Sequence, residues 1–519
     1  MTVKNLTRDE ARARAALLDV ASYDVTLDLT GDEDFGSTSV VRFTCREPGA
    51  TTFVELDGVL VAAELNGRPL NGLEGNRLAL TDLAGQNVLT VTARGAYSRT
   101  GEGLHRFTDP ADGLVYLWAQ SFLDDAQRMF ACFDQPDLKA TFRLTVDAPA
   151  PWTVIANARG TRTGNRWTFA PTERISTYLF TVAAGPWHSE HRWYGTPGEQ
   201  GGIELGLHCR RSLGAHLDAD ELFEVTAQCL DLQQQLFARR YPFGDTYDQL
   251  FVPEFNHGAM ENPGAVTFTE DFVFRSRVTD DQRRKRAMVI AHEMAHMWFG
   301  DLVTMRWWDD LWLNESFAEL LGFFTVDRAT RHEDTWVDFS ATRKAWGYRA
   351  DQLPSTHPVQ GDVADNRGAL LNFDGISYAK GASVLRQLMA TVGEPAFFAG
   401  VQAYLARHAF GNTGFVIQFN QPLPDCRRFL RRFEHHGISG KQGRDNMAIR
   451  QMRGEIIRAK HCQHTMRFVP HRVARSGLAV EQALRCAVGI GFDRDIDFVR
   501  NRFHLGARFP HRFAGFARD

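Results

Sequence analysis

The sequence predicts a multidomain protein with an N-terminal antiparallel β domain, a following α+β domain and an atypical C-terminal segment. Its 519 residues, 44% hydrophobic and 24% charged, are enough for about three to four soluble domains. Short alternating apolar segments continue up to Trp187, and longer segments with helical periodicity dominate from His216 onward. Strands followed mostly by helices are typical of a β domain joined to an α+β domain.

The first predicted domain, residues 1–188, begins with a charged helix over residues 8–20. Apolar residues alternate with polar ones from Tyr23 to Leu29, which places the apolar side chains on one face of a strand. Similar segments, separated by Gly, Asp, Asn and Pro, cover residues 39–45, 52–56, 87–93, 140–148 and 153–156. This spacing predicts an antiparallel β domain.

The second predicted domain, residues 189–413, combines strands with longer helices. A periodic helix is expected over residues 216–239, and strands over residues 249–253 and 265–269. Further helices are predicted over residues 289–299, 315–326, 336–346 and 379–391.

The helix over residues 289–299 carries a candidate metal site in the sequence HEMAH. His292 and His296 are one turn apart, so both imidazoles project from one face and can reach one zinc ion. Glu315 supplies a carboxylate at the start of the next predicted helix. Two histidines, one carboxylate and an open fourth position are typical of a catalytic zinc site, so we expect one Zn²⁺ per chain.

Two further glutamates have predicted roles at this metal site. Glu293 follows the first ligand but is turned about 100° around the helix, so it can act as general base towards a water on the zinc. Glu319 lies one turn after Glu315 and can accept the free N–H of a ligand histidine. The alternative for each is an ordinary helix glutamate in contact with solvent.

Composition favours a cytoplasmic protein without a membrane span. The seven cysteines are scattered, odd in number and without CxxC spacing, so no disulfide framework is expected. The charged start of the chain is not a secretion signal, and no uninterrupted run of about 18 apolar residues is present. We expect a monomer that binds peptides, with neither a nucleic acid nor a membrane as partner.

The last segment, residues 414–519, differs from the rest in composition. It holds 20 Lys and Arg against 9 Asp and Glu, with eighteen Arg, eleven Phe and no Tyr or Trp. A nucleic-acid-binding tail is one interpretation, although no such motif is visible. Its periodicity is poor, and we expect it to be poorly ordered.

Several motifs together resemble the zinc aminopeptidases of the aminopeptidase N type, peptidase family M1, especially their bacterial, actinobacterial-looking branch. The motifs are GAMEN at residues 258–262, HEMAH at 292–296 with Glu315, FACFDQPDLK at 130–139, WWDDLWLNE at 307–315 and ISYAKG at 376–381. The resemblance extends from about Tyr23 to Thr413. It implies that the second domain is a thermolysin-like catalytic domain.

The resemblance also implies roles for residues outside the metal site. Glu261 matches the glutamate that binds the free α-amino group of the substrate, by charge-assisted hydrogen bonds. Tyr378 matches the tyrosine that stabilises the oxyanion of the tetrahedral intermediate. The other members of the matching loop, whose backbone binds the peptide, are Gly258, Ala259, Met260 and Asn262.

The chain departs from the family pattern at two places. The family usually has Gln-x-Glu in front of the FACF motif; here Gln120 is kept as a substrate-binding candidate, but Phe122 occupies the place of the acid. Asp124 or Asp125 are the candidates to replace it. After Thr413 nothing resembles the continuation of the family, which indicates a truncated or frameshifted chain that has lost the last catalytic-domain helices.

Three functions follow as alternatives. The first is a zinc aminopeptidase in which Glu293 assists attack by a zinc-bound water on the N-terminal peptide bond. The second is an inactive, truncated remnant, because a site needs its supporting elements. The third is an endopeptidase with an open groove that admits longer chains.

Overall fold

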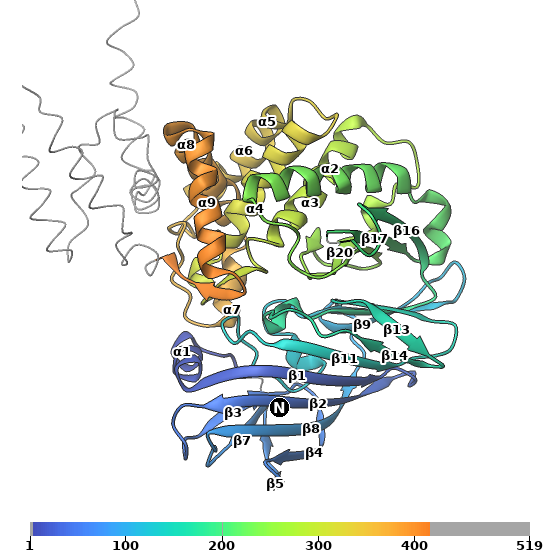
Figure 1. Ribbon diagram of the computed structural model, residues 1–519, viewed down its shortest axis with the longest axis vertical. Helices are drawn as coiled ribbons and strands as arrows, with labels where there is room; N and C mark the ends of the chain where they lie inside the picture. Colours follow the sequence, from blue (N-terminus) through green and yellow to red (C-terminus); the bar gives the residue numbers. More distant parts are fainter. Residues whose placement is uncertain (1–3, 200, 416–519) are drawn as a thin grey trace, which may run out of the picture.

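The computed structural model describes residues 4–199 and 201–415, so the predicted tail from residue 416 onward lies outside the described residues. The strands of the N-terminal region fill the lower part of Figure 1, and most of the helices from Ala219 onward lie above them together with a second group of strands. The predicted order of a β-rich region followed by a helix-rich one is confirmed.

Helix α1 (Arg8–Leu17) leads into the largest sheet. Its first turn is closed by a capping box between Thr7 and Glu10, which satisfies backbone N–H groups that have no partner within the helix. The helix ends three residues before the predicted end at Val20, because the alternating burial of strand β1 already begins at Leu18.

The largest sheet has the strand order β13-β14-β11-β1-β2-β8-β4-β5. Its pairs are antiparallel except β1 and β11, which run parallel with Ser22 opposite Thr141. The strands are β1 (Leu18–Asp28), β2 (Asp34–Cys45), β4 (Val59–Leu65), β5 (Arg68–Leu70), β8 (Gln86–Ala96), β11 (Thr141–Asp147), β13 (Gly160–Thr163) and β14 (Arg166–Phe169).

Two smaller sheets complete the N-terminal region. One has the order β12-β15-β10-β9 and the other β3-β7-β6. Their strands are β3 (Thr52–Glu55), β6 (Leu73–Glu74), β7 (Arg77–Leu80), β9 (Gly103–Thr108), β10 (Val115–Gln120), β12 (Thr153–Ala156) and β15 (Val182–Gly185), with short 3-10 turns at Ala126–Arg128 and Thr177–Leu179.

A five-stranded sheet follows with the order β16-β17-β18-β20-β19. Its first strand begins at His188, next to the predicted division between residues 188 and 189, and that division stays a prediction. The strands are β16 (His188–Tyr194), β17 (Ile203–Cys209), β18 (Thr246–Val252), β19 (Ala259–Met260) and β20 (Ala265–Thr269), with 3-10 turns at Arg211–His216 and Glu270–Phe272. Strand β19 lies at the edge, so one side of its backbone has no partner strand in this sheet.

Three helices, α2 (Ala219–Phe237), α3 (Asp280–His296) and α4 (Trp312–Ala329), form the helical centre of the second region. Helix α3 begins nine residues before the predicted start at Val289, at a capping box between Thr279 and Gln282, and ends at His296 instead of Phe299. At Gly322, helix α4 approaches α3 so closely that an added Cβ would lie 3.2 Å from the Cβ of His292. The absence of a side chain at Gly322 therefore allows the two helices to pack closely beside the HEMAH motif.

The remaining helices follow α4 in the chain. The predicted helix over residues 336–346 is divided into α5 (Thr335–Asp338), a π-helical turn (Phe339–Arg343) and α6 (Lys344–Gln352). The predicted helix over residues 379–391 begins within a second π-helical turn (Ile376–Lys380) and continues as α8 (Gly381–Val392). The other elements are β21 (Val303–Met305), α7 (Asn366–Ala369), α9 (Glu394–His408) and β22 (Gly411–Thr413), with 3-10 turns at Trp308–Asp310 and Leu370–Asn372.

The apolar core runs through both regions, from β1 and β2 to α3, α4 and α8. Among the described residues, no helix combines the length and the hydropathy needed to cross a membrane.

Candidate metal centre and active site

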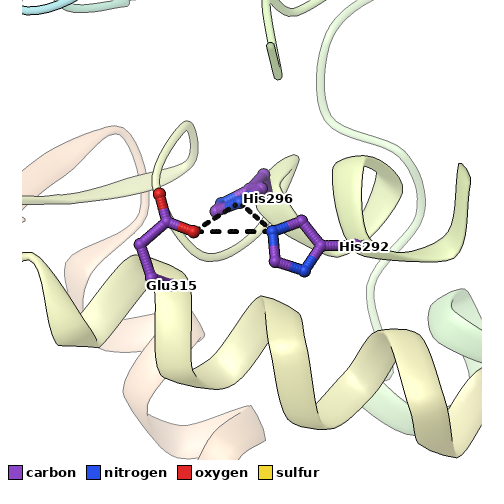
Figure 2. A group of neighbouring side chains, drawn as sticks. All are labelled: His292, His296 and Glu315. Carbon is purple, nitrogen blue, oxygen red and sulfur yellow. Dashed lines mark hydrogen bonds and ion pairs between the residues drawn. The ribbon is translucent and has the colours of Figure 1, made fainter. Parts of the chain in front are cut away.

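Helices α3 and α4 bring the three predicted metal ligands together. His292 and His296 project from the last two turns of α3, and Glu315 faces them from the first turn of α4 (Figure 2). All three side chains are buried. The two-histidine face predicted from the helix period is therefore present, and Glu315 lies opposite it.

The ligand atoms of these residues converge on one point. The Nε2 atoms of His292 and His296 lie 3.1 Å apart. Oε2 of Glu315 lies 3.4 Å from each of these nitrogens. Among the described residues, this oxygen is buried and has no hydrogen-bond partner. A buried carboxylate oxygen without a donor is costly, and a cation held between the three atoms would satisfy it.

Backbone contact sets the tautomer of His296. Its Nδ1 lies 2.9 Å from the carbonyl oxygen of Phe299. Because a carbonyl only accepts, Nδ1 carries a proton, and in the neutral imidazole Nε2 then presents its lone pair to the cluster. The turn that ends α3 thus orients a candidate ligand.

Glu319 lies beside His292, although another residue is its main partner. Oε2 of Glu319 is 3.7 Å from Nδ1 of His292, an ion-pair distance longer than a hydrogen bond. The guanidinium of Arg343 donates to both oxygens of Glu319, at 2.5 and 3.1 Å. Glu319 is therefore close enough to His292 for an ion pair but too far away for the predicted hydrogen bond to its N–H.

The charges in the cluster influence one another strongly. Burial lowers the pKa of His292. Burial raises the pKa of Glu315, but the two histidines lower it more strongly, so the pKa falls to about 2. The surrounding carboxylates raise the pKa of His296 in spite of its burial, so a metal ion bound here would take the place of a proton on this imidazole.

Glu293 and Glu261 form a second group with His296. Ligand atoms of Glu261, Glu293 and His296 all lie within 4.8 Å of one another. Both glutamates are buried, which raises the pKa of each carboxyl. The two carboxylates predicted to act as general base and as amino-group clamp are therefore neighbours of the metal candidates.

The GAMEN segment is not wholly a loop. Ala259 and Met260 form strand β19, paired with Phe268 and Thr267 of β20, and the carbonyl of Gly258 accepts from the backbone N–H of Thr269. The backbone of an edge strand is available to an extended peptide. Asn262 is buried, donates to Thr267, and has a side-chain oxygen without a partner in the described part of the chain.

Tyr378 lies in the π-helical turn Ile376–Lys380 and faces the cluster. Its ring is parallel to that of His292 within 7°, with the ring centroids 6.0 Å apart. Burial raises its pKa, and the nearby carboxylates of Glu315 and Glu261 raise it further. The hydroxyl is therefore neutral and available as a hydrogen-bond donor.

Gln120 ends strand β10 and is 3% exposed, yet neither atom of its amide has a hydrogen-bond partner among the described residues. Phe122, two residues later, contacts Tyr178, His257, Trp308 and Phe373, with ring centroids 4.9 to 6.4 Å away. An aromatic group thus occupies the position where the family usually has an acid.

The nearby aspartates have other partners. Asp124 accepts from the amide of Asn366 at 3.0 Å, and Asp125 accepts from Arg128 at 2.6 Å. These contacts do not favour either one as a replacement for the missing acid.

Sequence reasoning missed Arg343 and Trp346. The guanidinium of Arg343 lies 4.5 Å from the ring centroid of Trp346, and the Trp346 ring lies 5.8 Å from that of Tyr378. Both residues follow the HEMAH motif at a long distance without a motif of their own. The packing of α6 against the second π-helical turn, which itself contacts α4, brings Trp346 to the site, and Arg343 ends the π-helical turn directly before α6.

Comparison with known proteins identifies relatives along most of the chain. The model of the peptidase M1 N-terminal domain matches residues 77–179, and that of the peptidase family M1 domain matches residues 221–418. Aminopeptidase N of Streptomyces lividans is 54% identical over 420 residues, 79% of this chain and 49% of the relative.

More distant relatives match over similar lengths. Tricorn protease-interacting factor F2 of Thermoplasma acidophilum is 31% identical over 76% of this chain and 50% of the relative. Aminopeptidase N of Canis lupus familiaris is 30% identical over 77% of this chain and 45% of the relative. The chain spans about half the length of these curated relatives.

Proposed function

The chain belongs to peptidase family M1, and we propose that it is a zinc-dependent aminopeptidase that hydrolyses the N-terminal peptide bond of peptides. The observation that carries this proposal is the convergence of His292, His296 and Glu315 on one buried point, 3.1 to 3.4 Å apart. Glu261 and Glu293 lie directly beside it.

The donor set suits a zinc ion. Two imidazole nitrogens and one carboxylate oxygen are the ligands of catalytic zinc sites that keep a position open. A zinc ion bound there would polarise the scissile carbonyl and lower the pKa of a water molecule.

The protein's own residues supply the remaining chemistry. Glu293 takes the proton of the attacking water and returns it to the leaving amine. The hydroxyl of Tyr378 donates a hydrogen bond to the oxygen on which negative charge develops. Both groups are supported by their positions beside His296 and His292.

Binding of the substrate's amino terminus determines which peptide bond is cleaved. The carboxylate of Glu261 binds the free α-ammonium group, and the edge of strand β19 pairs with the peptide backbone. The buried amide of Gln120, which lacks a partner among the described residues, is available to the first residues of the substrate. Only the first peptide bond then reaches the reacting groups.

The proposal includes a cytoplasmic monomer that acts on peptides. Four described cysteines, Cys45, Cys132, Cys209 and Cys229, are buried with free thiols, and free thiols are usual in a reducing compartment.

Hydrolysis of an amino-acid arylamide by the zinc-loaded full chain tests the proposal. We expect release of the arylamine, and a decrease in kcat of roughly 100-fold or more in Glu293→Gln because the general base is lost. Glu333→Gln, at an exposed position, serves as the matched control and should keep the rate. Equal rates in the parent and Glu293→Gln would exclude the proposed base.

Acetylation of the substrate separates an aminopeptidase from an endopeptidase. A peptide with a free amino terminus should lose its first residue, whereas the acetylated peptide should resist because Glu261 has no ammonium group to bind. Cleavage of the acetylated peptide at internal bonds would favour the open-groove endopeptidase instead.

A further inference from the structure

Arg343 is the partner of a buried carboxylate at the metal centre. The side chain of Glu319 is only 1% exposed, and Arg343 binds both of its oxygens. Glu319 in turn faces Nδ1 of His292 at 3.7 Å. Glu319 thus connects the guanidinium of Arg343 to a candidate metal ligand.

The same guanidinium reaches a second part of the site. It lies over the ring of Trp346, 4.5 Å from its centroid. Trp346 contacts Tyr378, with the ring centroids 5.8 Å apart. One side chain therefore contacts the neighbours of both His292 and Tyr378.

Arg343 and Tyr378 both lie in π-helical turns of the backbone. Arg343 ends the π-helical turn Phe339–Arg343, and Tyr378 lies within the π-helical turn Ile376–Lys380. Such turns are rare and often occur at functional sites, because they shift the side chains that follow. Helix α6, which directly follows the first turn, packs closely on the second: a Cβ added at Gly347 would lie 3.3 Å from the Cβ of Ala379.

We propose that Arg343 is a positioning residue of this centre: it holds Glu319 against His292 and, through Trp346, holds Tyr378 at the substrate. This inference rests on the proposed function, since it assigns Arg343 a role towards zinc and towards the reacting peptide. The paired contacts, a carboxylate with two hydrogen bonds and a stacked indole, limit the guanidinium to one orientation.

Zinc affinity of the full chain, measured by competition with a chromophoric chelator, tests the first half. We expect Arg343→Met to weaken zinc binding by roughly 10- to 100-fold, the usual effect of losing a partner behind the ligands. Arg328→Met is the matched control, because Arg328 also pairs with a carboxylate, Glu394, and lies over a ring, Phe324. Its zinc affinity should stay within about twofold of the parent.

A double variant separates positioning from simple neutralisation of a buried charge. Arg343→Met leaves Glu319 unpaired and can impair folding, whereas Arg343→Met combined with Glu319→Gln removes both charges. If Arg343 only balances Glu319, the double variant regains the zinc affinity of the parent, and the proposal is overturned. If it positions His292 through Glu319, the affinity stays at least about tenfold weaker.

The proposed effect of Arg343 on Tyr378 is tested at saturating zinc. Arg343→Met should lower kcat and leave KM nearly unchanged, because Tyr378 acts on charge that develops in the transition state. Parent protein that binds no zinc would contradict the proposed function itself. Parent protein that binds zinc, together with an Arg343→Met variant of equal affinity and equal kcat, would contradict only the role of Arg343.

Discussion

Removing the hydroxyl of Tyr378 leaves the three candidate metal ligands unchanged. In Tyr378→Phe we expect kcat to fall by about 10²- to 10³-fold, the usual cost of losing one donor to a developing oxyanion. KM and zinc affinity should be nearly unchanged, as measured with the arylamide substrate and the chelator. Tyr348→Phe, at a residue 47% exposed, is the control. An unchanged kcat in Tyr378→Phe would remove this hydroxyl from the mechanism.

Glu10 makes a pH-dependent contribution to stability at the start of α1. Its carboxylate accepts from Arg77 at 2.6 Å and from the backbone N–H of Thr7 at 2.9 Å. The hydrogen bond from Arg77 is the main cause that lowers its pKa from 4.5 to about 2. The folded state therefore binds fewer protons than the unfolded state between these values. The contribution is fully present above about pH 4.5 and is lost as the pH falls towards 2.

Glu10→Gln should lower Tm at pH 7 but have almost no effect near pH 2. Thermal unfolding across this range, followed by circular dichroism, measures the difference. Arg77→Met removes the main cause of the pKa shift, so in that background the Glu10→Gln effect should depend much less on pH. A Tm difference that is constant from pH 7 to pH 2 would contradict this assignment.

At the scale of elements, the contact between α3 and α4 determines the metal centre, because each helix carries part of it. A Cβ at position 322 would lie 3.2 Å from the Cβ of His292 and from the carbonyl oxygen of Met288. Gly322→Ala must therefore move α3 and α4 apart by a few tenths of an ångström. Since a misplacement of about 1 Å can cost 100-fold in rate, we expect zinc affinity and kcat each to fall by about tenfold.

The control for this substitution is Gly85→Ala, where an added Cβ meets no atom within 4 Å. It should leave zinc affinity and kcat unchanged. Full activity and affinity in Gly322→Ala would show that the helices separate without disturbing the site.

At the scale of the whole molecule, Lys139 connects the N-terminal sheets to the metal helix. Its buried amine, whose pKa burial lowers to about 7, donates to the carbonyl oxygens of Asp301 and Leu302, at 2.7 and 3.3 Å, after the end of α3. Lys139→Met leaves these buried carbonyls without this donor, which we expect to cost about 1 to 3 kcal/mol of unfolding free energy. Urea unfolding measures this cost, and Lys285→Met, at an exposed position on α3, should cost nearly nothing. Equal midpoints in the two variants would mean that the contact contributes no stability.

Sequence alone determined the features that depend on near neighbours in the chain. The four-residue spacing of His292 and His296 places both on one helix face wherever that helix lies, and alternation predicted β12 and β20 at their observed bounds. Helix ends were predicted less well. Val20 belongs to a strand and Phe299 to an isolated bridge with Val303, because pairing with β2 and with Val303 overrides local periodicity.

Only the tertiary structure decided what lies around the HEMAH helix. The two π-helical turns have no sequence signature, and the pairing of β19 with β20 converts part of an expected loop into an edge strand. Arg343 reaches Glu319 from 24 residues away. The 3.6-residue period of the helix determines which residues share a face. Which residues pack against that face depends on elements that are distant in the sequence. The zinc motif and Glu319 were therefore visible in the sequence, whereas Arg343 and Trp346 were not.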